Sequence, residues 1–258
     1  MQIDLQISDH VGSHKRIENK DQLGFYLAGL IEGDGYFGAT KLEIALHIKD
    51  KSTAYQLRRS LGFGQIYPYK GKQAIRFVIS NSKGLKSVIE LVNGKFVTDL
   101  KINQLLKHDY ANRFHLEILP PLRSISLKNH WLVGFLDADG SIGIFIAPSC
   151  SHKSKRSVRL EIKVSQKDSF IVHEIARIFQ IRTVSRDRKG IYRLNITGKD
   201  RIHKMIDYLD NFNFQTMKYT QYCIFRGCAR FMQAKKHLDF TGLFTVYKMQ
   251  QRLQNVYR

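Results

Sequence analysis

The sequence predicts an α+β fold built from two pseudo-symmetric units, each with a four-stranded antiparallel sheet backed by helices. Three observations lead to this prediction. A short motif occurs twice, as "LAGLIEGDG" at 27–35 and "LVGFLDADG" at 132–140. Segments that follow the two copies match each other at a nearly constant shift, and both copies continue with the same succession of helical and strand-like patterns. We therefore expect the order αββαββα in each unit.

The shift between matching segments indicates a duplication of domain size. The motifs are 105 residues apart, whereas "FVISNSKGL" at 77–85 and "LNITGKDRI" at 194–202 are related by a shift of 117. "KINQ" at 101–104 and "KYTQ" at 218–221 keep this shift. The extra residues therefore enter between 140 and 165, where we expect "APSCSHKSKRS" to form a longer polar loop.

Periodicity assigns the elements within each unit. Residues 22–34 are expected to form a helix that ends at Gly35. A period of two marks a strand at 41–49 and its counterpart at 159–165. Further helices are expected at 51–62 and 167–179, second strand patterns at 75–80 and 192–196, and closing helices at 83–92 and 199–209.

The repeat also suggests how the chain is divided. We expect an N-terminal extension over 1–20, a first repeat over 21–112, a linker over 113–127, a second repeat over 128–235 and a basic C-terminal helix over 236–258. The linker contains "HLEILPPLRS", which holds two of the four prolines. No secretory signal is recognisable at the N-terminus, and no apolar run reaches the roughly 18 residues of a membrane span.

The charge balance points to a polyanionic partner. Lys and Arg number 42 against 22 Asp and Glu, a net charge of +20, which favours nucleic acid over a ribosomal or membrane-surface role. The sheet faces opposite the helices carry many of these cations, and together they would form a saddle suited to the DNA major groove. The other interpretation is a set of solvated charges. The candidate DNA-binding residues are Lys41, His47, Lys49 and Arg76 in the first repeat, and Arg159, Lys163, Arg186, Arg188 and Arg193 in the second.

The acids of the motif suit a divalent cation. Side chains two positions apart on a helix point about 200° apart, so only one acid of each motif can face a shared site. The end of the helix adds carbonyl oxygens and the negative end of the helix dipole, and oxygen ligands favour Mg²⁺.

Small residues would allow the two motif helices to pack closely. Gly29 and Gly33 lie one turn apart, as do Gly134 and Ala138, so each helix has a flat stripe. If the helices pack along these stripes, Asp34 and Asp139 meet at the base of the saddle.

These motifs resemble the one that names the LAGLIDADG homing endonucleases, at seven of nine positions in the first copy and six of nine in the second. Two copies in one chain are similar to the monomeric, two-motif branch of that family. The resemblance implies a site-specific endonuclease that makes a metal-dependent double-strand break in a long, asymmetric DNA target. It further implies that Mg²⁺ is the cofactor, that Mn²⁺ can substitute and that Ca²⁺ supports binding without cleavage.

The resemblance also implies roles for individual residues. Asp34 and Asp139 would bind the metal, helped by the carbonyls of Gly33 and Ala138. Basic residues would organise solvent near each scissile phosphate, and the positions that match are Lys101 and Lys218. Gln166 matches a polar residue near the active-site water, but its counterpart is Ile48, which predicts unequal half-sites. Glu32 and Asp137, with Gly29 and Gly134, would serve the helix interface.

The main alternative is a binding protein on the same scaffold, either an intron-encoded RNA maturase or a DNA-binding regulator. Loss of the second acid of a motif would favour it, and both acids are present. The expected partners are therefore double-stranded DNA and, in a dual role, intron RNA. Richness in Lys, Ile, Phe and Tyr is compatible with an AT-rich organellar gene, either mitochondrial or chloroplast.

Overall fold

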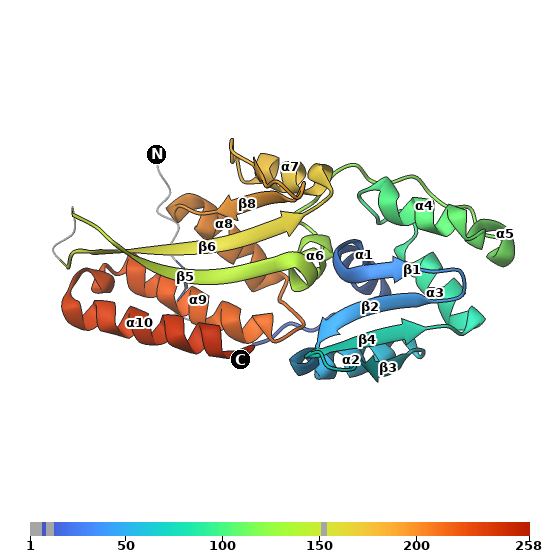
Figure 1. Ribbon diagram of the computed structural model, residues 1–258, viewed down its shortest axis with the longest axis horizontal. Coiled ribbons are helices and arrows are strands. Elements are labelled where there is room, and N and C mark those ends of the chain that lie inside the picture. Colours follow the sequence, from blue (N-terminus) through green and yellow to red (C-terminus); the bar gives the residue numbers. More distant parts are fainter. Residues whose placement is uncertain (1–6, 9–12, 151–153) are drawn as a thin grey trace.

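The computed structural model describes residues 7–8, 13–150 and 154–258. Parts of the expected N-terminal extension and of the expected polar loop therefore lie outside the described residues. The chain forms two units with one four-stranded antiparallel sheet each, and helices pack against both sheets (Figure 1). The predicted α+β class with two αββαββα units is confirmed. None of the described helices is long and apolar enough to cross a membrane.

The first unit has the sheet order β1-β2-β4-β3. The motif helix runs directly into the first strand of the sheet, and two short helices follow the closing helix. The elements are α1 (Lys20–Asp34), β1 (Gly35–Phe37), β2 (Leu42–His47), the 3₁₀ turn η1 (Ile48–Asp50), α2 (Lys51–Leu61), β3 (Gln65–Pro68), β4 (Ala74–Ile79), α3 (Ser82–Val92), α4 (Asp99–Lys107) and α5 (Tyr110–Phe114).

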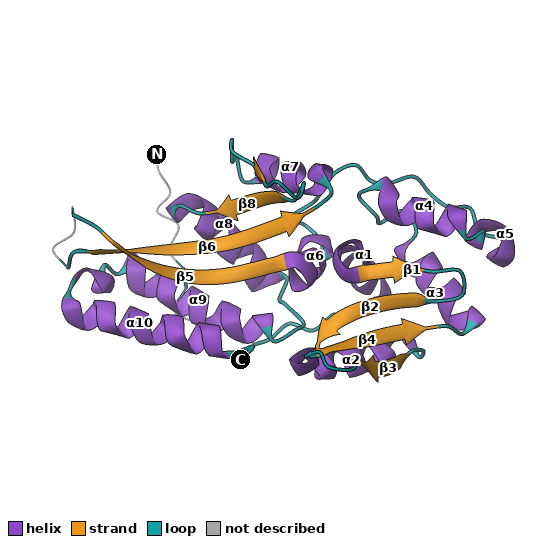
Figure 2. Ribbon diagram, in the orientation of Figure 1, coloured by secondary structure: helices purple, strands orange, loops and turns teal. Residues whose placement is uncertain are grey.

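The second unit repeats this topology with the order β5-β6-β8-β7, and its helices and strands alternate as in the first (Figure 2). The elements are α6 (Trp131–Asp139), β5 (Gly140–Pro148), β6 (Arg156–Gln166), α7 (Ser169–Ile178), β7 (Ser185–Arg186), β8 (Tyr192–Ile196), α8 (Lys199–Asn211), α9 (Lys218–Gln233), the 3₁₀ turn η2 (Lys236–Leu238) and α10 (Phe240–Asn255).

The two motif helices, α1 and α6, lie side by side at the centre of the molecule (Figure 1). Asn19 begins α1 by accepting a hydrogen bond from the Gln22 amide, and the Gly35 amide ends it by donating to Ile31. Residues from Leu23 to Glu32 are almost all buried, on every side of the helix. A helix that is apolar all round belongs in a core, and this one packs against the first sheet, α3 and the other motif helix.

Two details differ from the sequence prediction. The first strand pattern was expected to reach residue 49, but β2 ends at His47 and the Ile48 side chain is 38% exposed. The extra residues between 140 and 165 mainly lengthen a hairpin, because β5 and β6 extend to Pro148 and from Arg156 and so include both ends of the expected loop. Polar residues on the exposed face of a twisted hairpin gave the segment the composition of a loop.

Candidate active site

Backbone contact between α1 and α6 brings the two motifs together. A Cβ atom added at Gly29 would collide with the Trp131 carbonyl oxygen and lie 2.8 Å from the Phe135 amide nitrogen. A Cβ atom at Gly134 would collide in the same way with the Tyr26 carbonyl. Only glycine permits this approach, because the neighbouring atoms belong to the backbone and cannot rotate away.

The close approach continues to the ends of the helices. A Cβ atom at Gly33 would collide with the side chain of Ala138 and lie 3.2 Å from Oδ2 of Asp139. Asp34 follows Gly33 directly, so the second acids of the two motifs lie at one shared site. The sequence prediction placed these four residues together.

The first acid of each motif points away from that site into the protein. Glu32 accepts hydrogen bonds from the amides of Val97 (2.9 Å) and Thr98 (2.8 Å), and from Trp131 Nε1 on the other motif helix (3.1 Å). Burial raises its pKa to about 7, and the donors from Val97 and Thr98 oppose that shift. Glu32 therefore joins α1 both to the segment before α4 and to α6.

Asp137 makes the matching set of contacts from α6. It accepts from the hydroxyl of Tyr26 on α1 (2.9 Å) and from the Gln215 amide (2.8 Å), and it also contacts the Thr216 hydroxyl. Burial raises its pKa to about 6. Each first acid thus accepts from an aromatic donor across the helix pair, which couples the two units.

Asp34 and Asp139 are two carboxylates that repel each other in a partly buried site. Burial, and then the charge of Asp34, raises the pKa of Asp139 to about 7. Burial also raises the pKa of Asp34. Gln166, at the end of β6, donates from Nε2 to Oδ2 of Asp139 at 2.6 Å and fixes that carboxylate. The sequence repeat aligns Gln166 with Ile48, and the end of β2 at Leu46 and His47 holds no glutamine either, so the two halves of the site are unequal.

Lys101 and Lys218 are held at the carboxyl ends of the motif helices. Lys101 is 5% exposed, and its Nζ donates to the Gly35 carbonyl at 2.5 Å. Lys218 Nζ donates to the carbonyls of Leu136 (2.8 Å), Asp137 (2.8 Å) and Ala138 (3.1 Å). Burial lowers the pKa of both ammonium groups, while the charges of Asp34 and Asp139 raise it. Neither lysine is therefore a freely solvated charge.

The donor set fits Mg²⁺ better than a thiol-seeking metal. Among the described residues, no group of three or more His, Cys, Asp and Glu side chains could hold a metal ion. Mg²⁺ commonly uses one or two carboxylates together with substrate phosphates and water. A cation beside both carboxylates would also offset the negative charge of Asp34 that, after burial, raises the pKa of Asp139.

The open face of the first sheet carries its cations around an acid that sequence reasoning missed. Glu43 on β2 binds Lys41 (2.8 Å) and lies 3.9 Å from Arg76 of β4. It also accepts from the Tyr69 hydroxyl at 2.8 Å. The Arg76 guanidinium lies over the rings of Tyr67 and Tyr69. These contacts hold the Arg76 side chain in one orientation, whereas a fully solvated arginine would sample many orientations.

The second sheet also has an acid among its cations. Glu161 on β6 is buried and lies 3.6 Å from Arg159 and 3.4 Å from Lys163. The strand pairing gives Glu161 a different position from Glu43, because Lys163 pairs with Ser141 as Glu43 pairs with Tyr36. Arg193 pairs with Asp187 at 2.7 Å. Arg186 stacks on Tyr192, and Arg188 lies in the turn between β7 and β8.

His47 and Lys49 lie in a different setting from the one expected. Lys49 is in η1 rather than on a strand, and its Nζ donates to the carbonyls of Val256 (3.2 Å) and Arg258 (2.7 Å). The His47 ring lies edge-on to Tyr257 at 4.9 Å. Both residues therefore contact the last residues of the chain, which could not be foreseen because the contact joins positions about 200 residues apart.

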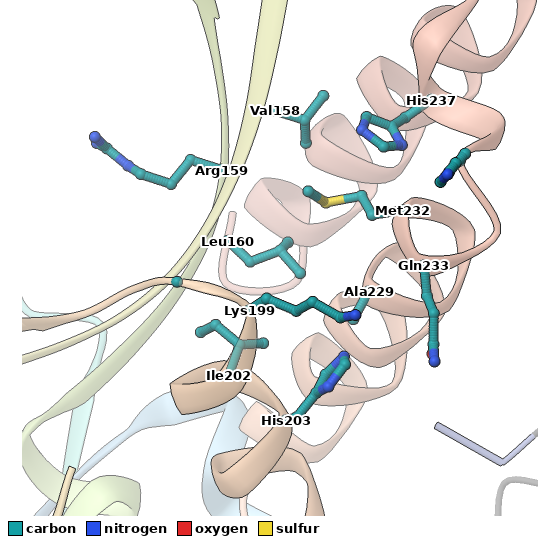
Figure 3. Close-up of a pocket in the computed structure, with 12 residues that line it drawn as sticks. Val158, Arg159, Leu160, Lys199, Ile202, His203, Ala229, Met232, Gln233 and His237 are labelled. Atoms are coloured by element: carbon teal, nitrogen blue, oxygen red, sulfur yellow. The ribbon is translucent and has the colours of Figure 1, made fainter. Parts of the chain in front are cut away.

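A separate cavity of about 380 Å³ opens among β6, α8, α9 and η2 (Figure 3). Its walls include Leu160, Ile202 and Met232, and none of the described residues that line it is a carboxylate. It belongs to the second unit alone, whereas the acids meet where the two units join. The cavity is therefore distinct from the candidate active site.

Comparisons with known proteins agree with this geometry. The model of the LAGLIDADG endonuclease family matches residues 27–110 and 132–229. The chain is 35% identical to an uncharacterised 37.2 kDa protein of cox1 intron 2 from Schizosaccharomyces pombe, over 97% of this chain and 79% of that protein. It is 28% identical to the intron-encoded DNA endonuclease ai2b of Dictyostelium discoideum, over 77% and 76%. Other intron-encoded relatives are longer, and the chain spans 30% and 27% of two of them.

The fold is likewise found in solved structures. The LAGLIDADG meganuclease I-AabMI, bound to uncleaved DNA, is similar with a TM-score of 0.71 at 20% identity, over 88% of this chain and 98% of that one. Each matched segment of the family model contains one motif and the sheet that follows it. The chain therefore belongs to the LAGLIDADG endonuclease family and carries both copies of the family motif in one polypeptide.

Proposed function

We propose that this protein is a homing endonuclease that hydrolyses one phosphodiester bond in each strand of a long, asymmetric DNA target, with Mg²⁺ as cofactor. The observation that carries the proposal is the meeting of Asp34 and Asp139 at the touching ends of α1 and α6, between the two cation-bearing sheets. A purely binding protein has no need for two carboxylates that repel each other beside a DNA backbone.

Asp34 and Asp139 would hold the metal together with phosphate oxygens of the substrate. A bound divalent metal would polarise the phosphate, lower the pKa of water and stabilise the leaving 3′ oxygen. The carbonyl of Gly33 is a further candidate ligand. The carbonyl of Ala138 already accepts from Lys218, so it can join the metal only by sharing or exchanging that hydrogen bond.

The remaining residues of the site position groups and supply charge. Gln166 fixes one oxygen of Asp139 and so orients that carboxylate. Lys101 and Lys218 place positive charge near both acids, but their ammonium groups donate to backbone carbonyls rather than to the carboxylates. This positive charge favours the entry of an anionic phosphodiester. Because only one half has a Gln at the strand end, we expect the two DNA strands to be cut at different rates.

The two sheets would read the target. The open faces of the two sheets carry basic residues on or beside their strands: Arg76, Arg159, Lys163, Arg186, Arg188 and Arg193. Lys41 lies beside Arg76, and both contact Glu43. Arginine can recognise guanine with two hydrogen bonds in the major groove, and lysine contacts phosphates. The two faces carry different residues, so the target is expected to be asymmetric. One chain supplies both halves, which favours a monomer.

The setting of the gene follows from its relatives. The S. pombe relative is named for an intron of cox1, and the D. discoideum relative is named as intron-encoded. We infer an intron of an organellar gene as the source of this chain as well. Binding of intron RNA is a second role that the same family scaffold could support.

The deciding experiment is selection of cleaved molecules from a randomised duplex library in Mg²⁺, with Ca²⁺ and metal-free arms. We expect a long asymmetric site to be cut in Mg²⁺ and bound but uncut in Ca²⁺. The Asp34→Asn and Asp139→Asn variants should bind the selected site without cutting it. If the wild-type chain enriches a duplex site but cuts it in no metal, the chain is a DNA-binding protein and the nuclease assignment is wrong.

A further inference from the structure

The outer side of α10 exposes a row of aromatic rings. Phe240 is 75% exposed, Phe244 57% and Tyr247 48%. Their spacing of i, i+4 and i+7 places them on one stripe of the helix. Three large rings left in water on a single helix are a marker of a binding surface rather than of chance exposure.

The helix itself is held firmly from behind. Val246 and Leu253 are buried against the core, and Gln250 Nε2 donates to the Ile144 carbonyl of the edge strand β5 at 2.8 Å. Gln221 of α9 donates to the Leu253 carbonyl. Figure 1 shows α10 running alongside α9 and β5. The aromatic stripe is thus presented on a rigid support and is not the packing face of the helix.

The segment that carries the aromatic stripe is basic. From 234 to the end, the chain holds Lys235, Lys236, Lys248, Arg252 and Arg258 against one acid, Asp239. The carboxylate of Asp239 caps α10 by accepting from the Gly242 amide at 2.6 Å. The Lys248 ammonium lies 4.5 Å from the centre of the Phe244 ring. The stripe therefore combines π faces with a local positive charge.

We infer that the α10 stripe, formed by Phe240, Phe244 and Tyr247 with Lys248 and Arg252, binds single-stranded nucleic acid. Aromatic rings stack on unpaired bases, and neighbouring cations follow the phosphates. The rings are spaced about 4.5–6 Å along the helix axis, at a rise of about 1.5 Å per residue, which suits successive unstacked bases. In a duplex the base faces are already covered, so the rings have no comparable partner there.

The stripe lies outside the two segments that the model of the LAGLIDADG endonuclease family matches. The matched segments end at residue 229, before η2 and α10 begin. The first unit ends differently, because Tyr110 and Phe114 of α5 are buried and stack on each other. A second copy of this chain is a poorer partner for the stripe. In a two-fold symmetric dimer, the cations of one stripe would lie opposite the same cations of the other and repel them.

Photo-crosslinking can locate the bound strand. The probe is a short oligouridine that carries one 4-thiouridine, mixed with the full chain and an excess of unlabelled random-sequence duplex DNA to occupy the sheets. We expect crosslinked peptides from 240–252. Crosslinks confined to β2, β4, β6 or β8 would mean that the strand binds only the sheet faces, and would overturn the proposal.

Anisotropy with the same oligouridine and with oligothymidine measures the contribution of the rings. We expect the Phe244→Ala, Tyr247→Ala double variant to bind at least roughly tenfold more weakly, because each base–aromatic stack contributes strongly to affinity. Tyr55→Ala is the matched control: Tyr55 is 50% exposed on α2 and lies beneath Lys51, but it has no neighbouring exposed ring on its helix. Equal loss in both variants, or none in the double variant, would refute the stripe.

Two further measurements test the other possible partners of the stripe, a second copy of the chain and a membrane surface. Sedimentation of the wild type and the double variant tests self-association, and flotation with anionic vesicles tests a membrane surface. A dimer or a vesicle complex that depends on these rings, without oligonucleotide binding, would replace the proposal. Cleavage of duplex DNA is measured separately. A chain that cuts no DNA can still bind the oligouridine on α10, and a chain that cuts DNA can fail to bind the oligouridine, so the two proposals are tested independently.

Discussion

Gly29 and Trp131 touch through their backbones across the two motif helices, so that a Cβ atom on Gly29 would collide with the Trp131 carbonyl oxygen. This contact, with its mirror at Gly134 and Tyr26, sets the distance between the two units. The position of Asp34 relative to Asp139 depends on it.

Alanine at Gly29 should therefore destabilise the whole chain. The methyl group can be accommodated only by separating α1 from α6, at a cost of about 1–3 kcal/mol or more in the free energy of unfolding. Gly227→Ala is the matched control, because a Cβ atom there meets nothing within 4 Å on α9. That variant should be slightly more stable, by about 0.5–1 kcal/mol. Urea denaturation checks both, and equal stability of the two variants would contradict the backbone contact.

Asparagine at Asp139 should abolish cleavage and preserve binding. It removes one of two carboxylates that would hold the metal, yet it leaves an oxygen for Gln166 to donate to. The melting temperature at pH 8 should rise, because the substitution ends repulsion with Asp34, which raises the pKa of Asp139. Cleavage gels, mobility shifts and thermal melts measure these effects. Normal turnover in this variant would remove Asp139 from the metal site.

Methionine at Lys218 should slow cleavage by roughly 100-fold or more, in the range of losing a group that stabilises developing charge. Affinity for the target should change little. The variant should also melt at a lower temperature, because three carbonyls at the end of α6 lose their donor. Lys86→Met, on the exposed face of α3, is the control. If single-turnover rates are the same in both variants, Lys218 has a structural role only.

The Glu161→Gln substitution should reduce the base specificity of DNA recognition. Removal of its charge frees Arg159 and Lys163, which lie 3.6 and 3.4 Å away. Freed cations contact phosphates of any sequence, so affinity for random duplex should increase and its salt dependence should steepen, by up to roughly one unit of log–log slope per new contact. Glu43→Gln should act on the other half-site.

The control for both glutamates is Glu174→Gln, which breaks a pair with Arg177 on α7, away from the strands. Binding across a salt series and cleavage profiles over single-base variants give the readout. An unchanged salt slope in the Glu43 and Glu161 variants would show that these acids do not restrain the cations.

The sequence by itself determined the duplicated plan of the protein. Period-two and helical patterns, both repeated, gave the order of elements, because burial of one face of a strand or helix is a local property of the residues. The second acids of the motifs, the lysines at 101 and 218 and the glutamine at 166 could also be selected, since each belongs to a repeated or recognisable position.

Only the tertiary structure decided which atoms meet. Nothing local shows that Glu32 accepts from Trp131, that Lys218 binds three carbonyls of α6, or that Lys49 contacts the chain end rather than extending a strand. These contacts join residues far apart in the sequence, so their geometry depends on how the two units pack. The exposure of the α10 rings was also decided there, because the same aromatic spacing fits a buried helix face until its neighbours are known.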